Sequence, residues 1–162
     1  MNRVRVGSLV AAALMFAVVA AAIAASGTKV TTHQTTRGKV LAAAANGRTL
    51  YLFTHDSGKT SRCSGQCATA WPPLLTTSKP VAGKGSGVKA ALLSTTRRSN
   101  GKLQVTYAGH PLYLYTGDTK AGQISGEGAN VFNGHWYIVS TSGTAIKPKS
   151  GGGLCNPLCP GY

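Results

Sequence analysis

Carboxylates are the scarcest chemical groups in this sequence, and two of them end the same repeated motif. The chain of 162 residues holds three Asp and Glu residues against 17 Lys and Arg residues. The segment 50–56, Leu-Tyr-Leu-Phe-Thr-His-Asp, recurs at 112–118 as Leu-Tyr-Leu-Tyr-Thr-Gly-Asp. If the copies met, Asp56 and Asp118 could form a catalytic dyad or bind a cation, but oxygen-ligand sites usually need several acids. We therefore expect each Asp to stabilise the turn that follows its strand.

Aromatic side chains recur together with these acids. Such rings could form a stacking platform for sugars or bases, but they also have the bulk that a small β core needs. In each copy the Leu residues alternate with the aromatic ones, so the two sets point to opposite faces of a strand that is covered on both sides. We predict core packing for the motif aromatics and the two Trp, which are Tyr51, Phe53, Tyr113, Tyr115, Trp71 and Trp136.

Four cysteines form two close pairs, Cys63/Cys67 and Cys155/Cys159. The basic start and apolar run of the first 25 residues indicate export, and an exported protein meets an oxidising environment, where disulfides are the default state. Sequence alone leaves three connectivities open, and we favour the two local bridges, Cys63–Cys67 and Cys155–Cys159. The alternative is a metal-linked or thiol-redox protein. However, the spacing is not that of the redox C-x-x-C motif, and no suitable His pair accompanies the cysteines.

Hydrolase chemistry is a second alternative, because Ser, His and Asp residues are all present. No nucleophile elbow or oxyanion-forming motif accompanies them, and there is no phosphate-binding loop or dinucleotide fingerprint. The four His residues do not recur between the two copies. We therefore expect a non-enzymatic protein with no catalytic residues, no cofactor and no metal site.

The first 25 residues have the three parts of a secretory signal peptide. Arg3 and Arg5 precede an apolar run at 9–25, and Ala22-x-Ala24 provides a cleavage signal. An uncleaved Ala-rich anchor is the alternative, and only then would a membrane hold the protein. No Cys lies near this segment, so we expect no lipid anchor, and the separated Arg residues do not form a twin-Arg signal. The protein is predicted to be secreted or extracytoplasmic, at the cell envelope.

Turn and strand signals predict an all-β fold, with two pseudo-symmetric hairpin or meander repeats packed as one small domain. We expect a flexible spacer at 26–37, repeat 1 at about 38–75, repeat 2 at about 88–140 and an irregular Gly/Pro/Cys tail at 141–162. Asn46-Gly47 and Asn100-Gly101 are the clearest hairpin-turn signals. Strands are predicted at 40–45, 48–54, 90–98, 102–107, 112–116 and 135–140, with at most a short helical turn near 63–71.

These segments together resemble a known family. The pattern Tyr-x-(Phe/Tyr)-x-x-Asp occurs at 51–56 and 113–118, Cys-Ser-Gly-Gln-Cys-Ala-Thr-Ala-Trp-Pro-Pro-Leu follows at 63–74, and Gly-His-Trp-Tyr lies at 134–137. Over roughly 40–140 the chain is similar to the bacterial secreted repeat or predicted lipoprotein family with the Tyr-x-(Phe/Trp/Tyr)-x-x-Asp motif. That family is usually described as of unknown function, so the resemblance implies no activity. Many members are lipoproteins, but this chain lacks the lipid-acceptor Cys.

The formal net charge of +14 attracts polyanions. For an exported protein, anionic envelope polymers and lipid head groups are available, and no specific nucleic-acid motif is present. The basic residues are scattered, with only Arg97 and Arg98 adjacent, so solubility is the simpler interpretation. We hypothesise an exported, non-enzymatic, envelope-associated β module whose expected partner is an anionic envelope component.

Overall fold

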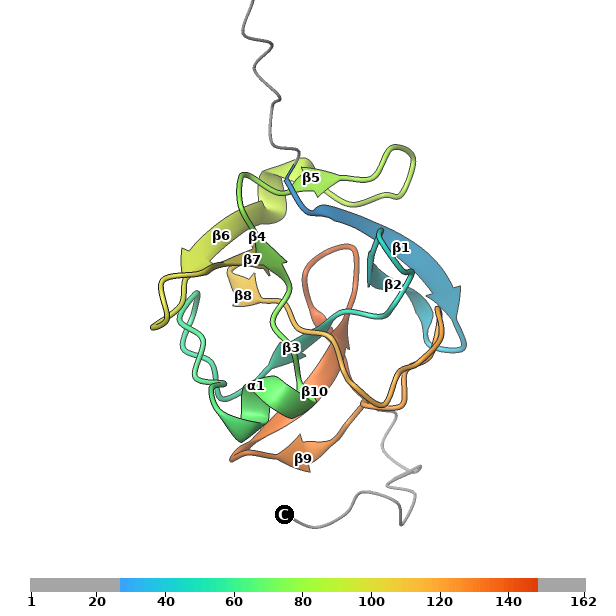
Figure 1. Cartoon of the computed structure of the whole chain (residues 1–162). Helices are drawn as coiled ribbons and strands as arrows, with labels where there is room; N and C mark the ends of the chain where they lie inside the picture. The colour runs from blue at the N-terminus through green and yellow to red at the C-terminus, as the bar shows by residue number, and fades with distance from the viewer. Residues whose placement is uncertain (1–26, 149–162) are drawn as a thin grey trace, which may run out of the picture.

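The computed structural model describes residues 27–148, and strands form most of its regular structure (Figure 1). One helix, α1 (Gln66–Ala70), and one 3-10 turn, η1 (Ala90–Leu92), accompany the strands in this part of the chain. The predicted all-β class is confirmed, and the predicted helical turn near 63–71 corresponds to α1. The strands are β1 (Lys29–Thr35), β2 (Gly38–Ala43), β3 (Tyr51–Phe53), β4 (Leu75–Thr76), β5 (Val81–Ala82), β6 (Leu93–Arg97), β7 (Leu103–Tyr107), β8 (His110–Pro111), β9 (Asn130–Val131), β10 (Gly134–Val139) and β11 (Ala145–Ile146).

Three small sheets are built from these strands. The first has the order β2-β1-β5, with β1 antiparallel to β2 and parallel to β5. The second has the order β11-β10-β3, and β9 also pairs with β10. The third has the order β4-β7-β6, and β8 also pairs with β7. Because β3 of the first copy pairs with β10 of the second, the two repeats are interleaved rather than simply adjacent.

The segment 26–37 was predicted to be a flexible spacer, and this prediction is wrong. Residues 29–35 form β1, which pairs with β2 along its length and lies beside β5 (Figure 1). Val30 in this strand is fully buried, and the Thr32 hydroxyl donates a hydrogen bond to the Ser86 carbonyl oxygen at 2.6 Å. The Ser/Thr-rich composition is typical of a spacer, but β-branched Thr also suits a strand when a partner strand lies alongside.

Both Asn-Gly turns form, with different consequences for the chain. Asn100-Gly101 closes the β6–β7 hairpin, where the Arg98 N–H donates to the Lys102 carbonyl oxygen at 2.9 Å. The chain also reverses at Asn46-Gly47, but it stays beside β2 only briefly before β3 pairs with β10. The predicted returning strand at 48–54 is observed as the shorter β3 (Tyr51–Phe53). The main partner of β3 is β10, which belongs to the other repeat.

Three further predicted elements differ in extent from the observed ones. The segment 90–98 begins with η1 and becomes extended only in β6. In place of a regular strand at 112–116, Tyr113 makes isolated bridges to its neighbours. The tail predicted to be irregular from 141 begins with a hairpin instead, in which β11 pairs with β10. Gly143 permits this turn because its φ of 90° is strained for residues with a side chain. The remainder of the tail from 149, with the predicted Cys155–Cys159 bridge, and the predicted signal segment 1–25 lie outside the described residues.

The repeated segments separate two apolar clusters. The Leu side chains of the two copies pack in one cluster, and the motif aromatics pack in the other. The predicted division into a Leu face and an aromatic face is therefore confirmed. The first cluster includes Leu50, Leu52 and Leu112 with Val30, Leu41 and Leu74, and the second includes Tyr51, Phe53 and Tyr113 with Trp71, Trp136 and Cys63.

Candidate functional site

The two copies of the motif meet at their first Tyr residues. Tyr51 and Tyr113 form an antiparallel bridge in which each backbone N–H donates to the other's carbonyl oxygen, at 2.9 and 3.0 Å. Both side chains are fully buried in the aromatic cluster. Tyr51 and Tyr113 are therefore related by a local two-fold axis, and this pairing fixes how the two motifs face each other.

Each Asp binds the Tyr of the other copy, and the first of these pairs joins Tyr51 to Asp118. The Tyr51 hydroxyl donates to Asp118 Oδ2 at 2.6 Å. The other carboxylate oxygen, Oδ1, accepts the backbone N–H of Ser125 at 2.8 Å, which holds the loop that follows. Asp118 is fully buried, so water does not compete for these bonds.

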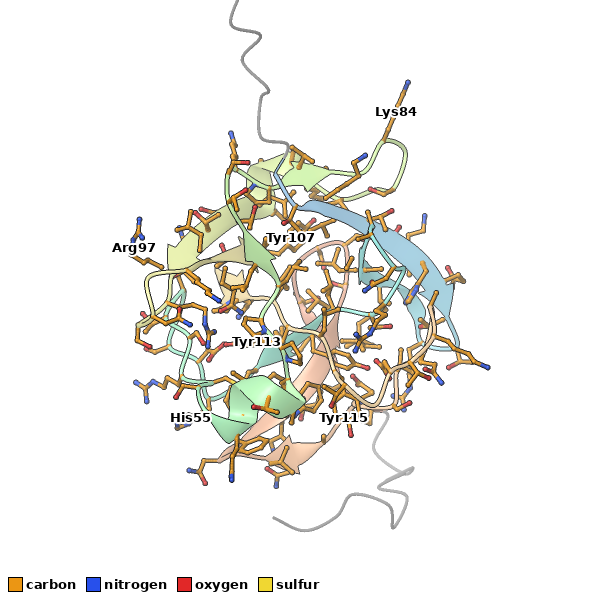
Figure 2. All side chains as sticks on the ribbon, in the orientation of Figure 1. His55, Lys84, Arg97, Tyr107, Tyr113 and Tyr115 are labelled. Atoms are coloured by element: carbon orange, nitrogen blue, oxygen red, sulfur yellow. A yellow bond between two sulfur atoms is a disulfide. The ribbon has the colours of Figure 1, made fainter. Side chains whose placement is uncertain are left out.

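The second pair repeats this arrangement with the copies exchanged. The Tyr113 hydroxyl donates to Asp56 Oδ2 at 2.8 Å, and the Arg62 N–H donates to Asp56 Oδ1 at 2.8 Å. Ser61 Oγ also lies 2.7 Å from the Tyr113 hydroxyl. Figure 2 shows Tyr113 inside the molecule, with His55, the neighbour of Asp56, toward the end that carries α1. In both copies the carboxylate holds its own loop with one oxygen and the other repeat with the second.

The two carboxylates do not form a shared dyad in this structure, since each has its own set of hydrogen-bond partners. Burial is the largest influence on both groups and raises the pKa of Asp56 and of Asp118 above its ordinary value. Burial and the neighbouring carboxylate also raise the pKa of Tyr51 and Tyr113. At neutral pH these hydroxyls therefore stay protonated and donate, which suits a structural contact better than nucleophilic or base chemistry.

Six aromatic rings of the two repeats contact one another, and their stacked contacts cross between the repeats. Trp71 and Trp136 stack on each other with ring centroids 4.0 Å apart. Trp136 also stacks on Phe53 at 4.1 Å, and Trp71 stacks on Tyr115 at 4.3 Å, so each Trp meets a motif ring of the other copy. The Tyr of its own copy approaches each Trp edge-on, at 5.3 Å for Tyr51 and 5.1 Å for Tyr113. Trp71 and Trp136 are 2% and 0% exposed, which leaves no open stacking platform at these two rings.

Sequence reasoning missed a polar network beneath the Asp56 loop. The Arg98 side chain donates to Gln104 Oε1 at 2.6 Å, to Ser61 Oγ at 2.8 Å and to the Cys63 carbonyl oxygen at 2.5 Å. Gln104 is fully buried and donates in turn to the Leu112 carbonyl oxygen. The signal that could have revealed this network is a long amide within the alternating segment 102–107, because a buried amide needs polar partners.

The predicted local disulfide between Cys63 and Cys67 is present, with Cα atoms 5.2 Å apart. The bridge closes the loop that leads into α1, and both cysteines are buried in the aromatic cluster. It therefore holds α1 and the following Trp71 against the core, and both sulfurs are covered by other side chains.

The third acid, Glu127, is also engaged inside the molecule. Its Oε2 accepts the Ile138 N–H at 2.7 Å, whereas Oε1 is buried without a hydrogen-bond partner. Burial raises the pKa of Glu127 to about 7, although the Ile138 hydrogen bond and the charge of Arg37 act in the opposite direction. This carboxyl is thus the acid of the chain most ready to be neutral near physiological pH.

Residues 27–148 offer no group of three His, Cys, Asp or Glu side chains placed to hold a metal ion. Within the same range, no helix is long and apolar enough to cross a membrane. His55 packs against the Phe53 ring at 5.8 Å, and His33 Nε2 lies 3.1 Å from Thr49 Oγ1. These two histidines therefore belong to different parts of the fold.

The geometry defines a class of protein: a two-repeat β domain in which each copy supplies the Tyr that binds the other copy's Asp. The model of a family described as "secreted repeat of unknown function" matches residues 24–75 and 94–140, more than half of the chain. The chain belongs to this family. The first match begins before β1, so it includes the strand in the predicted spacer segment. No curated protein and no solved structure matches the chain.

Proposed function

We propose that this protein is an exported, non-enzymatic module of the cell envelope that binds an anionic envelope component through its basic surface. The description of the family as secreted supports export. The use of the motif Tyr and Asp residues as contacts between repeats supports a non-enzymatic role, because these side chains are already engaged with each other.

One observation carries this proposal: the acids face inward and most of the bases face outward. Asp118 is fully buried, and Asp56 and Glu127 each accept a backbone N–H in a half-buried site. Figure 2 shows Lys84 and Arg97 extending away from the ribbon. A surface with so few exposed carboxylates has a positive field that attracts polyanions. The exposed basic residues are Lys29, Lys39, Lys59, Arg62, Lys79, Lys84, Lys89, Arg97, Lys102, Lys120 and Lys147.

Binding of the exported protein to isolated cell envelopes tests the proposal. Sedimentation should recover the protein with the envelopes at low salt and release it at about 1 M NaCl, where the Debye length is about 3 Å. A lack of binding at low salt, or binding indifferent to salt, would contradict an electrostatic role.

A pair of triple variants separates charge from side-chain identity. Lys29, Lys79 and Lys84 are exposed, so replacing all three with Arg keeps the charge and should preserve envelope binding. Replacing the same three with Glu reverses the charge and should weaken binding. Equal binding by the two variants would contradict the proposal, provided that near-UV circular dichroism shows both to be folded.

A further inference from the structure

Two large apolar side chains stand exposed at one end of the molecule, close to several lysines. Leu75 in β4 is 38% exposed and Val81 in β5 is 40% exposed, and these are the exposed large apolar residues of the described chain. Val81 pairs with Lys29 at the start of β1, and Lys79 precedes Val81 by two residues. Single exposed apolar residues are ordinary, but a set flanked by cations is a feature of surfaces that meet lipid.

An open groove of about 460 Å³ runs beside Leu75 at the edge of the third sheet. Thr28, Leu75 and Leu103 line it, and Lys102 stands beside them. The loop after β5 adds Lys84, which Figure 2 shows pointing outward beyond that strand. We call this surface the basic pole, and it consists of Lys29, Leu75, Lys79, Val81, Lys84 and Lys102.

None of the three Asp and Glu side chains, all of which lie within the described residues 27–148, belongs to the basic pole. Figure 2 places His55, which precedes Asp56, toward the α1 end of the molecule, whereas β5 and Lys84 lie at the opposite end. Asp118 is buried against Tyr51, and Glu127 bonds to Ile138 in β10. The lysines of the pole therefore face solvent without an acid among them, which makes the pole complementary to an anionic surface.

The chain also enters the described domain at this pole. The backbone of Gly27 packs against Lys79 and Pro80 so closely that a Cβ there would overlap the Lys79 carbonyl. The preceding 26 residues include the apolar run at 9–25. Whatever precedes Gly27 in the chain therefore joins the described domain beside Lys79 and Pro80.

From these observations we infer that the basic pole is a docking surface for a bilayer that contains anionic phospholipid. The lysines meet the phosphate groups, while Leu75 and Val81 reach the boundary between head groups and acyl chains. A soluble polyanion would use the same charges but would gain nothing from the two apolar side chains. This inference rests on the proposed function, because it names the anionic component and the face that binds it.

Vesicle binding by the exported form, or by a chain that starts at Ser26, tests the docking surface. A chain that starts at Ser26 keeps both apolar clusters and the hydrogen bonds described above. The protein should bind phosphatidylglycerol/phosphatidylcholine vesicles at low salt and bind pure phosphatidylcholine vesicles far less. Near an anionic surface each Lys contributes roughly fivefold to affinity, so Lys29→Gln/Lys79→Gln/Lys84→Gln should lose on the order of 100-fold.

Two controls decide whether position and lipid matter. Lys39→Gln/Lys59→Gln/Lys120→Gln removes the same charge away from the pole and should bind vesicles at least tenfold more tightly than the pole variant. Leu75→Gln/Val81→Thr should weaken vesicle binding but leave binding to inorganic polyphosphate unchanged. Equal losses for the two Lys variants would overturn the docking surface. Polyphosphate binding without vesicle binding would overturn the lipid assignment and leave the proposed function standing, whereas binding to neither probe at low salt would overturn both.

Discussion

Asp118 accepts two hydrogen bonds in a site that excludes water, and this environment decides what the residue can do. Its carboxylate satisfies the Tyr51 hydroxyl and the Ser125 N–H at once. Removing the carboxylate would leave the buried Tyr51 hydroxyl without its acceptor, at a cost of about 1–3 kcal/mol, and would also release the Ser125 N–H in its partly exposed loop. Asp56 has the equivalent partners, Tyr113 and Arg62, in a half-buried site. A scarce acid is thus used where a neutral side chain could not serve both donors equally well.

Glu127 gives a prediction of how stability depends on pH. Its pKa is raised in the folded state from 4.5 to about 7, so its contribution to stability is fully present below pH 4.5 and is lost as the pH rises through 7. We expect Glu127→Gln to gain stability relative to the wild type as the pH rises from about 4.5 to 8. Urea denaturation of both proteins at several pH values measures this difference.

The comparison with the variant is needed because the pKa values of other groups also change on folding. The raised pKa values of Asp56 and Asp118 act in the same direction as Glu127, whereas burial lowers the pKa of His33, which favours the folded state at higher pH. These groups remain in both proteins, so their contributions cancel in the difference. Parallel pH profiles for wild type and Glu127→Gln would show that Glu127 has no perturbed pKa.

The helix α1 is short and depends on its covalent link. The helix has five residues and no side-chain hydrogen bond at its N-cap, so it has little stability of its own. Because the Cys63–Cys67 bridge closes a short loop, the Cys63→Ala/Cys67→Ala variant should lose about 2 kcal/mol in free energy of unfolding. Chemical denaturation measures the loss, and Ser64→Ala, an exposed position in the same loop, is the control. Unchanged stability of the double variant would mean that packing alone holds α1.

The strand β1 makes a second prediction at this scale. Val30 is fully buried in the Leu cluster, so Val30→Ala should cost about 2 kcal/mol through lost burial and the cavity left behind. Gln34→Ala changes an exposed residue of the same strand and should cost less than about 0.5 kcal/mol. Equal stabilities of these two variants would restore the interpretation of this segment as a spacer. Thermal or urea unfolding distinguishes the outcomes.

At the scale of the whole molecule, local patterns were readable from the sequence and partners across the fold were not. The alternation in 50–56 and 112–118 revealed the Leu and aromatic faces, and the Asn-Gly pairs marked both turns, because each depends on neighbouring residues. The repeat showed that the two motifs are alike, but it contained no information on which Tyr meets which Asp. The segment of β1 was predicted to be a spacer although its partner β2 follows after a tight turn, because Val30 is its one large apolar residue and no apolar alternation marks the strand.

The exchange of partners between repeats should be measurable as coupling energies between the Tyr and Asp residues of the two motifs. Tyr51→Phe and Asp118→Ala remove the two sides of one crossed pair, and Tyr113→Phe and Asp56→Ala remove the two sides of the other. Each crossed pair should show a coupling energy of about 1–3 kcal/mol, because the hydrogen bond has a charged acceptor and is largely buried. Pairs taken within one copy should couple by less than about 0.5 kcal/mol.

The most direct measurement is therefore a complete set of double-mutant cycles over these four positions, read as free energies of unfolding in urea at neutral pH. The structure predicts strong coupling for Tyr51 with Asp118 and for Tyr113 with Asp56, and weak coupling for the two pairs within a copy. Stronger coupling within each copy than between copies would contradict the exchange and would indicate that each motif forms an independent hairpin.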